Sequence, residues 1–151
     1  MTQTVHYEDN LFFLSAQIKT IREGLTLDID ENFFIDKVVE DIFFIDATAE
    51  QLFSMLREKN HLIHRTDYLR KLMRVSKQFV KLLEDILQEE LSFASYLGPF
   101  SQKFQTAKSI HQSNITEIRT ILSKTIRSQK EEEDMVSSEE FNFLLQPNDE
   151  E

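Results

Sequence analysis

The sequence predicts an all-α fold: an elongated up-down bundle of about four helices with an acidic, mobile C-terminal tail. Hydrophobic residues make up 40% and charged residues 29% of the 151 residues, which is enough apolar material for one core. Apolar positions recur at spacings of three and four over long stretches, the period of a helix face. Only two glycines and two prolines occur, fewer than the many turns of a β-sandwich or barrel require.

The first helix is expected from Tyr7 to about Glu23. Its core-facing side repeats every three or four residues, at Leu11, Leu14, Ile18 and Ile21. Gly24 is expected to end this helix, because glycine is common just past a helix C-terminus. Asp28 or Asp30 can then cap the next helix.

A second helix is expected from Glu31 to about Asn60. Its main apolar stripe consists of Ile35, Val38, Val39, Ile42, Ala49, Leu52, Phe53 and Leu56. Thr48 and Gln51 resemble a capping box, so the sequence leaves open a break near Asp46–Thr48.

The third helix is expected to run from a cap at Thr66 and Asp67 to about Tyr96. Gly98 and Pro99 are the clearest break in the chain, and Pro99 fits the start of a fourth helix. The apolar face of that helix extends to Ile126. We therefore expect a helical bundle domain over residues 1–130 and an acidic tail over residues 131–151.

Charge divides the chain in the same place. The net charge is −10, and residues 131–151 contain nine acids and no Lys or Arg. This leaves 18 acids against 17 bases in residues 1–130. Within that body, residues 28–50 carry eight acids and one base, whereas residues 57–81 carry eight bases and two acids. Such blocks indicate complementary faces or a polar surface for a partner.

Several function classes receive no support from the sequence. The absence of cysteine excludes disulfides, thiolate metal sites and cysteine nucleophiles. Glycine-rich phosphate loops, a Gly-x-Ser-x-Gly elbow and His-Glu-x-x-His are absent, so we expect no enzyme and no cofactor. No targeting signal stands out and no apolar run is long enough to span a bilayer, so a cytoplasmic location is expected.

The histidines offer an alternative function, a bundle that binds a metal or a small ligand. His61 and His64 have metal-ligand spacing, but Arg57, Lys59 and Arg65 surround them with positive charge, which favours a polar turn instead. His111 lies on the apolar stripe of the fourth helix near Asn114. A buried His–Asn layer of this kind usually fixes the register between helices.

A basic stripe recurs at helical spacing on the third helix, at Arg70, Arg74, Lys77 and Lys81. The pI of about 4.9 argues against nucleic acid as its partner. The stripe is then a solvated face, a complement to the acidic second helix, or a surface that binds a protein.

A second apolar line on the second helix consists of Phe33, Phe44 and Met55, eleven residues apart and opposite the main stripe. A helix that is apolar on two faces is either central in its fold or presents one face to a partner. The first helix, a second copy of the chain in a homodimer, or another protein could cover this line, and the sequence leaves the choice open.

The tail contains an apolar cluster with helical spacing at Phe141, Leu144 and Leu145. Ser137 and Glu140 form a capping-box pair before it, and Pro147 stops the helix after it. This is the pattern of a peptide that binds as a helix in a groove, although the segment could also pack on its own bundle.

Together these features predict a non-enzymatic protein–protein interaction module, an adaptor or chaperone-like helical bundle that binds a partner protein. Its predicted binding residues are the apolar line of the second helix, the basic stripe of the third, and the apolar cluster of the tail.

Overall fold

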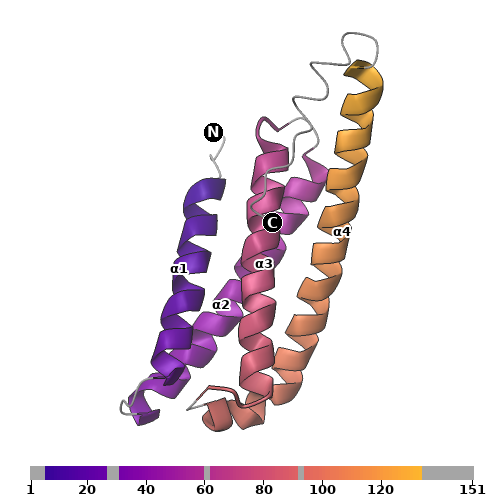
Figure 1. The fold of residues 1–151 in the computed structure, drawn as a ribbon. Helices are drawn as coiled ribbons and strands as arrows, with labels where there is room; N and C mark the ends of the chain where they lie inside the picture. The colour runs from indigo at the N-terminus through magenta and orange to yellow at the C-terminus, as the bar shows by residue number, and fades with distance from the viewer. Residues whose placement is uncertain (1–5, 27–30, 60–61, 92–93, 134–151) are drawn as a thin grey trace. The chain divides into compact units, whose positions relative to one another are not determined.

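The computed structural model describes residues 6–26, 31–59, 62–91 and 94–133. It contains the helices α1 (Tyr7–Thr26), α2 (Glu31–Glu58), α3 (Arg65–Leu87) and α4 (Ser101–Glu133), with a short 3₁₀ helix, η1 (Ala94–Phe100), before α4 (Figure 1). No strand occurs in these ranges. The predicted all-α class and the four helices are therefore confirmed. Residues 131–133 of the predicted acidic tail belong to α4, and residues 134–151 lie outside the described residues.

The chain divides into two compact units, Met1–Ile118 and Arg119–Glu151. The first unit holds α1, α2, α3, η1 and the beginning of α4, and the described part of the second unit is the rest of α4. In the first unit, α1 and α3 run in the same direction and α2 runs in the opposite one (Figure 1). Within the described residues, no helix is both long enough and apolar enough to cross a membrane.

Helix α1 extends past its predicted end. The predicted core positions Leu11, Leu14, Ile18 and Ile21 are all buried, and Leu25 continues the same spacing. Gly24 was expected to stop the helix, but it lies inside the last turn, and α1 ends at Thr26. Burial of Leu25 in the core stabilises this extra turn by more than glycine weakens it, since a glycine inside a helix costs only about 1 kcal/mol.

Helix α2 is continuous, so the break that the sequence left open near Asp46–Thr48 does not occur. The predicted stripe is buried except for Ile35, which is half-buried, and Ile45 is buried as well. Ile45 fills the interval between Ile42 and Ala49. The core contact of α2 is therefore uninterrupted where a capping box had suggested a new start.

The predicted end of α3 at about Tyr96 is wrong, because the helix stops at Leu87. A Schellman motif closes it: the N–H of Glu89 donates to the Ile86 carbonyl at 3.1 Å, and that of Glu90 to the Asp85 carbonyl at 2.8 Å. Glu89 takes the left-handed conformation (φ 55°) that usually belongs to glycine. Gly98 and Pro99, the expected boundary, lie inside η1.

The start of α3 also differs from the prediction. The N-cap is His64, in a left-handed conformation with no side-chain cap bond, and Thr66 and Asp67 lie in the first turn. The Arg65 side chain instead holds the turn after α2, because its Nε donates to the Leu56 carbonyl at 2.6 Å.

Polar contacts fix the register of the first part of α4 on α2. His111 is only 1% exposed, and its Nε2 lies 2.7 Å from Asp46 Oδ1. One turn further on, Asn114 Nδ2 donates to Glu50 Oε1 at 2.6 Å. The predicted role of His111 and Asn114 in helix register thus has a structural basis, with acidic side chains of α2 as their partners.

Candidate partner-binding groove

Side-chain contacts hold α1 beside α3 at intervals of seven residues. The pairs are Lys71–Glu8 at 2.7 Å, Ser15–Gln78 at 3.0 Å and Arg22–Asp85 at 2.6 Å. Because each pair has the same separation in sequence, the two helices are parallel and in register over these positions. Seven residues are two helical turns, so one face of α1 stays against one face of α3.

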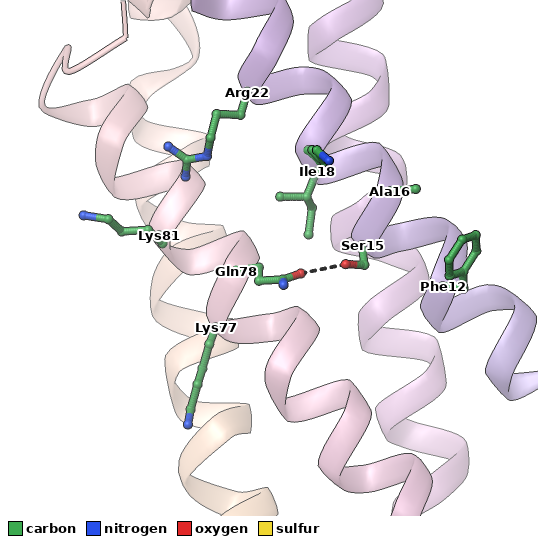
Figure 2. A pocket seen from close by; sticks show the side chains of 9 residues that line it. Phe12, Ser15, Ala16, Ile18, Arg22, Lys77, Gln78 and Lys81 are labelled. Atoms are coloured by element: carbon green, nitrogen blue, oxygen red, sulfur yellow. Dashed lines mark hydrogen bonds between the residues drawn. The ribbon is translucent and has the colours of Figure 1, made fainter. Parts of the chain in front are cut away.

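A groove runs along the outside of this helix pair. Its larger hollow, of about 790 Å³, is lined by Phe12, Ser15, Ala16, Ile18, Lys19, Arg22, Lys77, Gln78 and Lys81 (Figure 2). A second hollow of about 290 Å³ shares Phe12, Ser15 and Gln78 with the first. The two hollows are therefore neighbouring parts of one surface, which we call the α1/α3 groove.

The groove exists because small side chains occupy the middle of α1. Ser15 and Ala16 fill little space, and Figure 2 shows Ser15 and Gln78 pointing toward one another between the helices. Ile18 is buried and contributes apolar surface to the lining. Phe12 lines both hollows and is 77% exposed, an unusual state for a large aromatic side chain.

Positive charge is concentrated at one end of the groove. Among the described residues, the larger hollow is lined by four bases and no acid, whereas Glu8 joins the bases that line the smaller hollow. Arg22 and Lys81 share a single carboxylate, Asp85, at 2.6 Å and 3.2 Å. Lys71 is instead shared by two carboxylates, Glu8 at 2.7 Å and Asp67 at 3.3 Å. Arg22, Lys81 and Asp85 together therefore carry a net positive charge at the Arg22 end.

The ionisation of these pairs agrees with their geometry. Burial of Asp85 opposes its ionisation, but the hydrogen bonds and charges of Arg22 and Lys81 outweigh burial, so the pKa of Asp85 is lowered. Hydrogen bonds to Glu8 and Asp67 raise the pKa of Lys71. Asp85 thus stays charged at neutral pH and anchors two bases beside the groove.

The predicted basic stripe is divided by the structure. Arg74 lines the smaller hollow, and Lys77 and Lys81 line the larger one. Arg70 is exposed on α3 and lines neither hollow.

The predicted apolar line of α2 is partly covered by α1. Phe44 is 48% exposed, and its ring meets that of Phe13 edge-on at 5.9 Å between centroids. Met55 is half-buried, and the side chain of Phe33 lies outside the description. Phe44 and Phe13 together form an exposed aromatic pair across α1 and α2. Phe141, Leu144 and Leu145 of the tail all lie outside the described residues.

The structure does not bring the described histidines together. His111 is enclosed by Asp46 and the ring of Phe79, and its buried Nδ1 has no hydrogen-bond partner among the described groups. His64 is exposed beside Tyr68, and His61 lies outside the description. In the described ranges, no cluster of three or more His, Asp or Glu side chains is placed to hold a metal ion.

Sequence reasoning missed the contribution of α1 to this surface. Phe12 and Phe13 stand off the buried stripe of α1, and Lys19 and Arg22 lie beside it. The signal was present, because two aromatic residues occupy positions of an amphipathic helix that should be polar. What the sequence lacked was the pairing of α1 with α3, which joins these residues to the basic stripe.

Comparison with known proteins finds similarity to a curated bacterial protein. No family model matches the chain, and no solved structure matches it significantly. A curated protein of Treponema pallidum (strain Nichols), described as an uncharacterized protein, is 24% identical over 152 residues. The match covers 97% of this chain and 75% of the relative. The chain is therefore similar along nearly its whole length to a protein whose description assigns no activity.

Proposed function

We propose that this protein is a non-enzymatic interaction module, an adaptor or chaperone-like helical bundle that binds a partner protein through the α1/α3 groove. The observation that carries the proposal is Phe12, a large aromatic side chain that is 77% exposed between two hollows. Exposed aromatic side chains beside apolar hollows are typical of interface hot spots. The proposal includes a cytoplasmic location, which a cysteine-free chain suits.

Site-specific photo-crosslinking in cells tests the proposal. A photoreactive phenylalanine analogue replaces Phe12 in one variant and Ile63 in the control, because Ile63 is 75% exposed and lines neither hollow. We expect one protein to be crosslinked at position 12 and not at position 63. The purified partner should then bind the unmodified chain and fail to bind Phe12→Asp. Equal crosslinking at both positions, or none at position 12, would contradict the proposal.

The apolar line of Phe33, Phe44 and Met55 and the tail residues Phe141, Leu144 and Leu145 remain proposed partner-binding elements. A second copy of the chain is one partner they could bind, which sedimentation at several protein concentrations would reveal. The alternative function, metal or ligand binding through His61, His64 or His111, also remains a prediction. Metal analysis of protein purified without a His tag tests it.

A further inference from the structure

The groove has the length of a peptide segment. Its lining on α1 extends from Glu8 to Arg22, which at 1.5 Å per residue is about 21 Å. A compact small molecule would fill one hollow, whereas a helix of three to four turns would contact both. Because the proposed function already requires a protein partner, the length favours a helical segment of that partner.

The chemistry of the lining specifies what such a segment carries. The four bases of the larger hollow are Lys19, Arg22, Lys77 and Lys81, and Asp85 is the carboxylate that Arg22 and Lys81 share. A basic segment would meet repulsion here, because Lys19 adds to the two bases that share the single Asp85 carboxylate. Acidic side chains are the complement.

The position of Phe12 gives the segment an orientation. Phe12 adjoins the smaller hollow, and Lys19 and Arg22 follow it on α1 by seven and ten residues, about 10 and 15 Å along the helix. A bulky apolar side chain can pack on Phe12 while acids about two to three turns away reach Lys19 and Arg22.

We propose that the α1/α3 groove binds an acidic amphipathic helix of a partner protein, with an apolar anchor on Phe12 and carboxylates at the Lys19, Arg22 and Lys81 end. This inference rests on the proposed function and deepens it, because it states the chemistry of the partner. Nucleic acid would also be attracted to a basic groove, so competition by DNA is an outcome that the test includes.

The test uses the full chain and two labelled helical peptides of about fourteen residues, measured by fluorescence anisotropy. Both carry leucine and phenylalanine on one face, and the positions beside that face are all glutamate in one peptide and all lysine in the other. We expect the glutamate peptide to bind and the lysine peptide not to bind. Raising NaCl from about 50 to about 500 mM should lower the affinity of the glutamate peptide about tenfold or more.

Charge-reversal variants locate the binding. Lys19→Glu and Lys81→Glu should each lower the affinity for the glutamate peptide about tenfold. Each change removes an attraction to the peptide's glutamates and adds a repulsion. Lys59→Glu makes the same charge change at an exposed position that lines neither hollow, and it should alter affinity by less than about twofold. Circular dichroism verifies that every variant is folded.

Equal binding of the two peptides would overturn the inference. So would equal effects of Lys59→Glu and Lys81→Glu, or displacement of the glutamate peptide by random-sequence DNA at equal concentration. A partner that is crosslinked at position 12 but contains no acidic amphipathic helix would also overturn it. That last result would leave the proposed function intact, so the two failures can be told apart.

Discussion

Asp85 is a buried carboxylate beside the basic end of the groove. Its carboxylate pairs with Arg22 of α1 and with Lys81 one turn away on α3. Since burying a charge is costly unless it is paired, Asp85 stabilises the fold only while both it and its partners are ionised. The same residue therefore affects stability and the placement of two groove bases.

Replacement of Asp85 by Asn should lower the free energy of unfolding by about 1–2 kcal/mol at neutral pH, because two charge-assisted contacts are lost and both partners remain partly exposed. The lowered pKa of Asp85 stabilises the folded state at a pH above its unfolded value, and this contribution is lost as pH falls through the folded pKa. The difference between wild type and variant in urea unfolding should thus shrink below about pH 4.

The control for Asp85 is Asp67→Asn, which removes an exposed carboxylate that pairs with Lys71. This variant should lower the free energy of unfolding by less than about 0.5 kcal/mol. The proposed role of Asp85 in stability would be contradicted if Asp85→Asn lost no more unfolding free energy than Asp67→Asn, or if its loss did not change with pH.

Phe44 tests whether the apolar line of α2 is a binding face. It is 48% exposed, and its ring meets that of Phe13 edge-on. Phe44→Asp should therefore lower the free energy of unfolding by only about 1 kcal/mol and leave a cooperatively folded protein. It should abolish any association that uses the apolar line. Thermal unfolding and a sizing column measure the two effects. A large fall in the melting temperature of the monomer would show that the line belongs to the core instead.

At the scale of elements, the end of α3 shows how a helix can stop without glycine. The Schellman bonds of Glu89 and Glu90 satisfy the last carbonyls, although a left-handed glutamate is unfavourable by about 1 kcal/mol. The early end at Leu87 leaves room for η1, which returns the chain to the start of α4. Helix α3 is thus shorter than its apolar periodicity suggests.

Glu89→Gly should raise the free energy of unfolding by about 0.5–1 kcal/mol, because glycine adopts the left-handed conformation without steric cost. Urea unfolding measures the change. Glu90→Gly is the matched control, since Glu90 has no positive φ, and there glycine should be neutral or destabilising. The same stabilisation at both positions would mean that the conformation of Glu89 carries no strain.

Periodicity predicted the helices well and their ends poorly. The buried stripes of α1 and α2 follow directly from their spacing, because one face of each helix is hidden from water. The end of α1 depends on whether Leu25 is buried, and the end of α3 on a backbone conformation that glutamate rarely adopts. Both depend on tertiary contacts or on a rare local state, which residue types alone do not reveal.

At the scale of the whole molecule, the groove could not be predicted from the sequence of a single helix, because residues of both α1 and α3 line it. The sequence identified the bases of α3, but Phe12, Lys19 and Arg22 join them only because α1 and α3 are parallel and in register. That register is set by contacts about 63 positions apart in the chain, beyond the reach of local patterns. A surface made by two helices is therefore a property of the fold.

Removal of residues 131–151 should leave the first unit folded, because its buried side chains all lie before that segment. The deletion also removes nine acids and changes the net charge from −10 to −1. Solubility should fall as repulsion between molecules is lost, so circular dichroism and thermal unfolding at low concentration are needed to show that the fold persists. A loss of cooperative unfolding would mean that the segment is part of the bundle.

Within that segment, we expect Phe141 and Leu145 to act as helical anchors for the partner that is captured at Phe12. Phe141→Ala and Leu145→Ala should each weaken binding by about 1–2 kcal/mol, the usual loss when an anchor is truncated. Asn142→Ala should change little, because residue 142 lies about 100° from residue 141 around a helix. Titration calorimetry with the purified partner separates the cases. Equal losses at all three positions would mean that no helical face exists, and no loss at any of them would reduce the segment to a solubilising acidic tail.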